Sequence, residues 1–354
     1  MTTFLQLHLL TFVPPANLNR DDMGKPKTAI VGGEMRLRLS SQSLKRAWRT
    51  SDIFRSRLEG HLGSRTQRFG EEIKSHLIER GIDAAKATEI AREIVSAFGK
   101  PKSDKDKNPT YTEQLAFLSP EEKQAALDLA VARAEGRAEP LDPKKTAQSL
   151  LKAADTAADI AMFGRMFADN ADFNREASVQ VAHAITTHRI AIEDDFYTAV
   201  DDLKRPSEDA GAGFVGNAGF GSGIFYLYIC VDTGLLTANL GGDKALAKGA
   251  VAALIEAAAK VAPNGKQASF ASRANASYIL AEKGSEQPRT LAAAFIEGVK
   301  PGDLLANSIE RLQDTRSKFE RAYGSLDVTH EIMNAPAGKG SLSEIIEFCT
   351  IWPK

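Results

Sequence analysis

A short alternating strand pattern runs without a break into an amphipathic helix between Met35 and Arg49. Ser40 or Ser41 can accept a hydrogen bond from a free backbone N–H and so begin the helix. Its first turn then carries the positive end of the helix dipole, where phosphate binds readily. The segment therefore predicts a strand followed directly by a helix whose N-terminus suits an anion.

The two faces of this predicted helix differ in chemistry. Leu44, Ala47 and Trp48 make one face apolar, so that it can pack on a sheet. The opposite face carries an amide and three cations, which are Gln42, Lys45, Arg46 and Arg49. A solvated basic face is the commoner meaning of such a pattern. The capped start and the basic residues upstream favour contact with the phosphates of a nucleic acid.

Any such contact must be local, because the formal net charge of the 354 residues is only −1. With 43% hydrophobic residues the chain can build a core. Between residues 20 and 57 the acids are few, namely Asp21, Asp22, Glu34 and Asp52. The cations of the same stretch are Arg20, Lys25, Lys27, Arg36, Arg38, Lys45, Arg46, Arg49, Arg55 and Arg57.

The two cysteines favour a reducing compartment over a disulfide framework, because Cys230 and Cys349 both lie in apolar segments. No apolar run is long enough to cross a membrane. The N-terminus lacks the basic segment of a signal peptide. We therefore expect a cytoplasmic protein without a membrane partner.

Strand patterns lie on both sides of a long helical stretch. An opening strand is predicted over 3–13, ended by Pro14 and Pro15 and followed by a polar loop over 17–33. Later strands are predicted over 177–190, 223–233 and 274–281, and helices over 243–262 and 303–323. This order is compatible with an α+β fold built on a ferredoxin-like (RRM-like) sheet, a layout that RNA-binding modules use.

Residues 60–175 are polar and mostly helical in pattern. Ser119 and Glu122 form a capping box around a proline at the first helical position, and Asp142 opens another helix before a proline. A charged loop over 99–109 separates such segments. We interpret the whole stretch as a helical insertion rather than a second independent core.

A Gly-x-Gly-x-x-Gly motif begins at Gly211 but lacks the strand before it and the helix after it that a dinucleotide site needs. The wider region 194–223 predicts a glycine-rich hairpin with Phe214, Val215 and Phe220 near its tip. A glycine-rich loop can also be merely flexible, without any binding role. The apolar side chains favour contact with bases or with a neighbouring subunit.

No metal, cofactor or catalytic residue is predicted. His183 and His188 lie in a strand pattern without other ligands at metal-binding spacing, so we expect hydrogen-bonded structural histidines. Asp21 and Asp22 could hold Mg²⁺ for phosphodiester cleavage, although adjacent loop acids are more often only solvated.

Six stretches are distinctive in combination, namely 17–27, 32–33, 38–47, 162–166, 179–184 and 221–226. In this order, over nearly the full length, they resemble the CasC backbone subunit of the type I-E CRISPR Cascade. The resemblance implies a ferredoxin-like palm, helical fingers and a hairpin thumb. The corresponding parts are a palm of 1–59, 176–193 and 224–354, fingers of 60–175 and a thumb of 194–223.

The resemblance also implies which residues meet RNA. Those expected on the guide backbone are Arg20, Ser40, Gln42, Lys45, Arg46 and Arg49. Arg165 and Met166 are expected near a displaced base, and Phe214, Val215 and Phe220 belong to the thumb. Four finger lysines match no family motif and stay candidates for target DNA, namely Lys105, Lys107, Lys144 and Lys145.

The expected function is that of a non-catalytic subunit that polymerises along one CRISPR RNA. Its partners would be that RNA, target DNA through guide pairing, head-to-tail copies of itself and other Cascade subunits. Two alternatives stay open. One is a metal-dependent ribonuclease that uses Asp21 and Asp22, and the other is a general single-strand RNA-binding protein.

Overall fold

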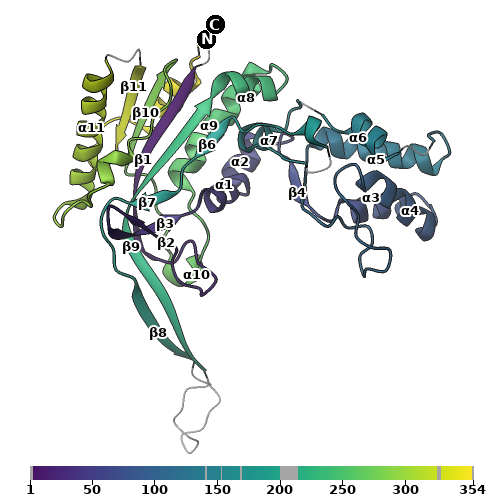
Figure 1. Ribbon diagram of the computed structural model, residues 1–354, viewed down its shortest axis with the longest axis horizontal. Coiled ribbons are helices and arrows are strands. Elements are labelled where there is room, and N and C mark those ends of the chain that lie inside the picture. Colours follow the sequence, from purple (N-terminus) through teal and green to yellow (C-terminus); the bar gives the residue numbers. More distant parts are fainter. Residues whose placement is uncertain are drawn as a thin grey trace, which may run out of the picture. The chain divides into compact units, whose positions relative to one another are not determined.

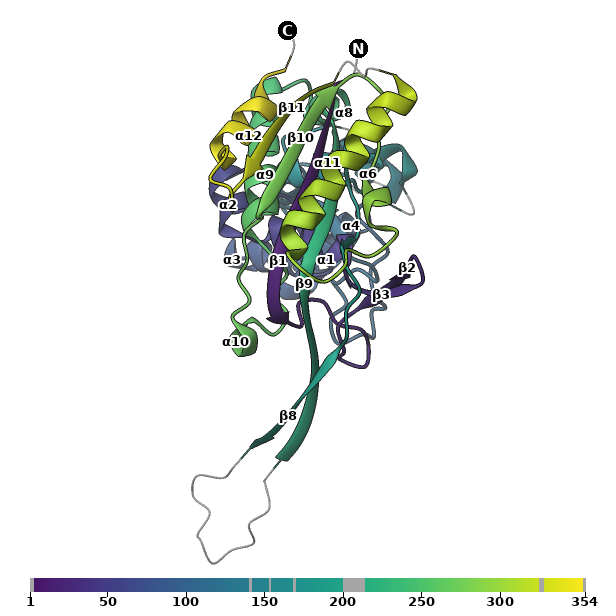
Figure 2. The same ribbon diagram turned by 90° about the vertical axis from the view of Figure 1, so that its left-hand side faces the viewer.

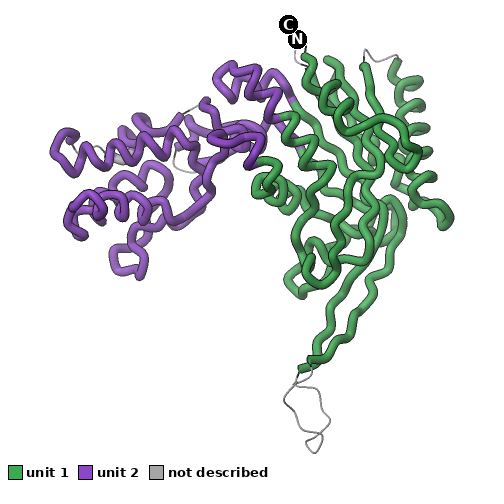
Figure 3. Tube along the Cα trace, turned by 180° about the vertical axis from the view of Figure 1, so that it is seen from behind, with its two compact units in different colours: residues 1–54, 181–231, 251–354 green, residues 55–180, 232–250 purple. Residues whose placement is uncertain are grey.

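The computed structural model describes residues 3–139, 142–152, 154–167, 170–199, 214–324 and 328–352. The chain forms two compact units, which Figure 3 shows in different colours. Unit 1 comprises Met1–Phe54, Val181–Val231 and Val251–Lys354, and unit 2 comprises Arg55–Gln180 and Asp232–Ala250. The chain passes between the units within α2 (Asp52–Arg57), β6 (Val179–Val181) and α9 (Lys244–Lys260), and at the end of β9.

Unit 1 is built on a large sheet whose strands follow the order β11-β10-β1-β9-β7-β3-β2. Every neighbouring pair with an assigned register is antiparallel. The strands in that order are β11 (Val328–Asn334), β10 (Tyr278–Gly284), β1 (Phe4–Ala16), β9 (Phe214–Asp232), β7 (Ala184–Thr186), β3 (Glu34–Leu39) and β2 (Thr28–Val31). A further strand, β8 (Glu193–Ala199), pairs with the first part of β9, and this hairpin projects beyond the sheet (Figure 2).

Helices cover both faces of this sheet (Figures 1 and 2). The 20-residue helix α11 (Leu304–Tyr323) covers one face, and α1 (Ser41–Arg49) lies on the other beside the C-terminal part of α9. The central strand β1 is therefore buried on both sides from Leu5 to Leu10. The remaining helices of unit 1 are α10 (Gln267–Phe270), the 3₁₀ helix η2 (Ala292–Phe295) and α12 (Leu342–Thr350).

A buried polar network lies within unit 1. Glu282 accepts hydrogen bonds from His8 (3.2 Å), Arg289 (3.0 and 3.1 Å) and Arg316 (2.8 Å). Burial opposes ionisation of Glu282, but the hydrogen bonds from these side chains outweigh it and hold its pKa well below the usual range. Burial lowers the pKa of His8, whose Nδ1 lies 2.9 Å from the hydroxyl oxygen of Tyr226. The network thus joins a neutral imidazole to an ionised carboxylate.

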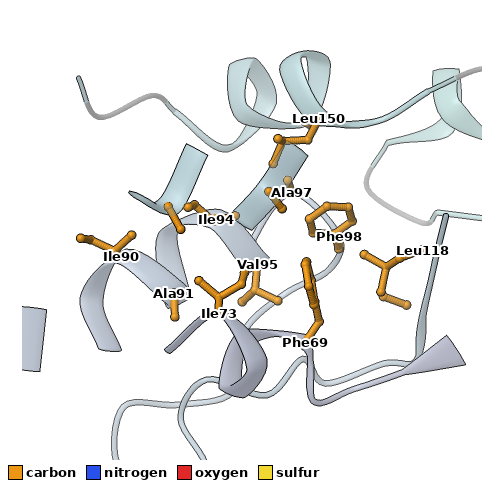
Figure 4. Close-up of a cluster of buried hydrophobic side chains, with 14 of the residues drawn as sticks. Phe69, Ile73, Ile90, Ala91, Ile94, Val95, Ala97, Phe98, Leu118 and Leu150 are labelled. Atoms are coloured by element: carbon orange, nitrogen blue, oxygen red, sulfur yellow. The ribbon is translucent and has the colours of Figure 1, made fainter. Parts of the chain in front are cut away.

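Unit 2 is mainly helical, as the sequence predicts for 60–175. It has its own hydrophobic core, in which Phe69, Ile73, Ile94 and Leu118 are almost fully buried (Figure 4). The expectation that this stretch lacks an independent core is therefore wrong. Its elements are β4 (Ser64–Thr66), α3 (Phe69–Glu79), α4 (Ala84–Val95), β5 (Ala116–Leu118), α5 (Pro120–Ala134), α6 (Pro143–Leu150), α7 (Ala158–Phe163), the 3₁₀ helix η1 (Ala171–Phe173) and α8 (Thr233–Asn239).

Local signals predicted several elements correctly. Ser119 and Glu122 form the expected capping box of α5, and Asp142 caps α6. The helices predicted over 243–262 and 303–323 are α9 and α11. The division into palm, fingers and thumb stays a prediction.

Three strand predictions need correction. β1 continues through Pro14 and Pro15 to Ala16, because its ladder with β10 ends at Leu10 and the prolines take no place in that ladder. The predicted loop 17–33 contains β2, which pairs with β3. The pattern over 177–190 forms two short strands, β6 and β7. Neither β11 nor α12 was predicted.

Candidate nucleic-acid interface

Helix α1 presents the predicted basic face on unit 1. Ser40 begins the helix, and its Oγ accepts a hydrogen bond from the backbone N–H of Ser43 (3.4 Å). On the inner side Trp48 is fully buried and donates from Nε1 to the carbonyl of Val261 (3.2 Å). These contacts fix which way the helix faces.

The predicted contact residues of α1 differ in exposure. Gln42 and Arg46 are exposed, whereas Lys45 and Arg49 are half-buried. Burial lowers the pKa of Lys45 because its ammonium group loses hydration. A phosphate bound nearby would compensate for that loss by favouring the charged form. Ser40 is buried and its hydroxyl caps the helix. A ligand at the start of α1 would therefore contact the N-terminus of the helix rather than the Ser40 hydroxyl.

The loop before β2 brings more cations to the start of α1. Asn19 Oδ1 accepts a hydrogen bond from the Ser40 N–H (2.8 Å). The Lys27 N–H donates to the Asn19 carbonyl (2.9 Å), and the Arg38 N–H donates to the Lys27 carbonyl (2.8 Å). Arg20, Lys27 and Arg38 therefore belong to neighbouring segments at this helix end. Lys27 and Arg38 were part of the predicted basic patch but were not predicted as RNA contacts.

Much of this charge is uncompensated. Within the described ranges, no carboxylate pairs with Arg20, Lys27, Arg38 or Arg46. Two cations of the predicted basic patch do have carboxylate partners. Arg36 is buried and bonds Glu34 (3.0 Å), and Lys25 lies 3.8 Å from Asp194. A surface with uncompensated cations attracts a polyanion.

The β8–β9 hairpin carries exposed apolar side chains on its described part. Phe214 and Val215 are 56% and 55% exposed, as predicted, and Phe196 is 68% exposed. Phe220 is half-buried, and its ring centroid lies 5.7 Å from that of Phe270. Phe220 pairs with Glu193 at the base of the hairpin, so the expectation that it lies near the tip is wrong. Residues 200–213 of the predicted thumb, Gly211 among them, lie outside the described residues.

In unit 2 the two predicted contact residues have opposite environments. The Arg165 side chain is 1% exposed, and its Nη1 lies 2.5 Å from Glu122 Oε2. The guanidinium of Arg165 is therefore held inside unit 2, and its expected place near a displaced base stays a prediction. Met166 is 82% exposed and accessible to a ligand. The finger lysines are exposed as well, namely Lys105, Lys107, Lys144 and Lys145.

The two adjacent loop acids lie at the surface of unit 1. Asp21 Oδ1 accepts a hydrogen bond from the Lys25 N–H (2.9 Å), and the Asp21 N–H donates to the Lys25 carbonyl (2.9 Å). Asp21 thus closes a turn, and both Asp21 and Asp22 are exposed. Among the described residues, no three His, Cys, Asp or Glu side chains form a group suited to a metal ion.

The model of the CT1975-like protein family, a family of Cas proteins, matches residues 5–345. The chain belongs to this family. The fold of this Cas protein is similar to a chain of a solved "CRISPR RNA-guided surveillance complex, pre-nicking", with a TM-score of 0.88 and 28% identity over 98% of this chain and 99% of that one.

A second solved chain, from a "CRISPR RNA-guided surveillance complex", has a TM-score of 0.76 and 24% identity. The match covers 98% of this Cas protein and 99% of that chain, and it shows similarity of fold. No curated protein sequence matches. In the part of the Cas protein that the structure describes, no helix has the length and apolarity needed to span a bilayer.

Proposed function

We propose that this Cas protein is a subunit of a CRISPR RNA-guided surveillance complex and binds the guide RNA along its basic face. We define the basic face as the exposed side of α1 together with Arg20, Lys27 and Arg38. The observation that carries the proposal is the group of cations Arg20, Lys27 and Arg38 near the start of α1, which pair with no carboxylate in the part of the chain that the structure describes. The family and the 28% identical chain of such a complex support it.

In finer terms, we propose a CasC-type backbone subunit of a type I-E Cascade that acts in the cytoplasm. Most of the ferredoxin-like palm and the β8–β9 hairpin of the thumb fall in unit 1. Copies lie head to tail along one guide, whose bases pair with target DNA. Other Cascade subunits complete the assembly. The exposed Phe214 and Val215 support contacts between subunits, because apolar side chains on a projecting hairpin need a surface to cover them.

We propose further that the subunit does not cleave nucleic acid. Asp21 is committed to a turn through Lys25, which supports a structural role. With Mg²⁺ present, Asp21→Asn and Asp22→Asn should therefore leave the stability of added RNA and DNA unchanged. Mg²⁺-dependent cleavage by the wild type, abolished by either change, would establish the ribonuclease alternative.

The proposed function is tested by the RNA that the protein retains when it is produced with a CRISPR array. Repeat-derived RNA of uniform length should co-purify. Arg20→Ala with Arg46→Ala should reduce its yield, whereas Lys318→Ala with Arg321→Ala on α11 should not. RNA of mixed origin and length would favour the general RNA-binding alternative, and absence of RNA would contradict both.

A further inference from the structure

Arg38 and His183 form a surface pair in unit 1 that the predicted RNA contacts do not include. Arg38 lies on β3 and His183 just before β7, and the two strands pair with Arg38 opposite Ile185. Arg38 Nη1 lies 2.9 Å from His183 Nδ1. Arg38 Nε also donates to the Thr28 carbonyl (3.3 Å), so the guanidinium is held at two points.

This contact determines the tautomer of His183. A guanidinium group can only donate hydrogen bonds, so Nδ1 must be the acceptor and carries no proton. Partial desolvation of the ring, followed by the charges of Arg38 and Lys27, lowers the pKa of His183. The ring is therefore neutral, and its single N–H is on Nε2. His183 is exposed, and within the described ranges its Nε2 has no hydrogen-bond partner.

The surroundings of this N–H suit an anionic ligand. Arg38 contacts the ring directly, and Lys27, whose carbonyl accepts a hydrogen bond from the Arg38 N–H, is near enough for its charge to act on the ring. Neither cation pairs with a carboxylate among the described residues. The loop that carries Lys27 is joined to the start of α1 by the Asn19–Ser40 hydrogen bond. A backbone phosphate drawn in by the two cations would leave oxygens for a neutral donor.

We propose that His183 donates a hydrogen bond from Nε2 to an oxygen of the ribose–phosphate backbone of bound RNA. Arg38 is the positioning residue that keeps the proton on Nε2. The inference rests on the proposed function, because it requires RNA on the basic face. It goes beyond the predicted role of His183 as a hydrogen-bonded structural histidine.

Two substitutions separate these roles, because asparagine places its polar end near Nδ1 and glutamine near Nε2. His183→Gln should keep a donor for RNA and bind within about twofold of wild type. His183→Asn can still accept from Arg38 but loses the outer donor, and its affinity should fall about two- to tenfold. Fluorescence anisotropy with labelled single-stranded RNA measures both, and unchanged melting midpoints confirm folding.

The salt dependence provides a second readout. A neutral donor releases no counterion, so His183→Asn should weaken binding without changing the log–log salt slope. With DNA of the same sequence, the penalty should disappear if the acceptor is the ribose 2′-hydroxyl and persist if it is a phosphate oxygen. A reduced slope in His183→Asn would overturn the neutral-donor assignment.

Several binding results would overturn the proposal: equal affinity in all three proteins, equal loss in both variants, or loss only in His183→Gln. Failure of the proposed function is distinguishable, since the wild type itself would then not bind RNA. Ring ¹⁵N spectra of the RNA-free protein give an independent result. They should show His183 protonated at Nε2 alone at pH 7.5, and protonation at Nδ1 would overturn the tautomer assignment.

Discussion

Asn19 Oδ1 accepts a hydrogen bond from the backbone N–H of Ser40 at 2.8 Å, and so joins the loop before β2 to the residue that begins α1. The carbonyl of the same Asn19 accepts from the Lys27 N–H. One residue thus fixes the loop that carries Arg20 and Lys27 relative to the helix that carries Lys45 and Arg49. The basic face depends on this connection.

Asn19→Ala should therefore destabilise unit 1. It leaves the N–H of the buried Ser40 without its side-chain acceptor, which costs about 1–3 kcal/mol. Asn19→Asp keeps an acceptor at the same position and is the matched control. Thermal melts should show a lower midpoint for the alanine variant than for the aspartate variant. Equal midpoints would mean that the hydrogen bond contributes little.

The helix at the centre of this interface was predictable because its signals are local. The cap Ser40, the apolar Leu44 and Trp48 and the cations between them lie within ten residues, and helical periodicity places each on its face. The loop was less predictable, because hydrogen bonds between distant segments set its course. Asn17 donates to Gly219, 202 residues away, at 2.8 Å.

The environments of Arg165 and Phe220 were not predictable because they too depend on contacts between segments far apart in the sequence. Nothing near Arg165 in the sequence indicates its burial, because its partner Glu122 lies 43 residues earlier. Phe220 packs against Phe270, which a hairpin pattern cannot predict. Sequence patterns indicate which residues suit RNA, whereas tertiary packing decides which of them stay at the surface.

The polar network of unit 1 predicts a pH dependence of stability. The pKa of His8 is lower in the folded chain than its ordinary value near 6.5, so the unfolded chain binds more protons as the pH falls below 6.5. Stability should therefore decline from pH 7.5 to 5.5. One such group contributes at most about 1.4 kcal/mol per pH unit.

His8→Gln keeps a donor towards Glu282 but cannot titrate, so its melting midpoint should fall less steeply with pH than that of the wild type. Some slope should remain, because the pKa values of His183 and His188 are also lowered, mainly by burial. Identical slopes for wild type and variant in differential scanning calorimetry would contradict a neutral His8.

The exposed hairpin residues should matter for assembly rather than for folding. Phe214→Ser with Val215→Ser removes apolar surface that is already exposed, so the melting midpoint of the isolated subunit should change little. Light scattering on long guide RNA should show reduced assembly. Phe220→Ala is the contrasting variant and should lower the midpoint, because Phe220 packs on Phe270. Normal assembly by the double serine variant would exclude these two residues from subunit contacts.

The salt dependence of RNA binding tests the central claim, that the basic face contacts the phosphates of the guide. In filter-binding titrations, Lys45→Ala with Arg49→Ala should weaken binding to all sequences alike, because phosphate contacts carry no base information. The log–log salt slope should decrease by about 1 for each lost contact. The control Lys318→Ala with Arg321→Ala on α11 should keep the wild-type slope. An unchanged slope in the α1 variant, or an equal decrease in the control, would contradict the account.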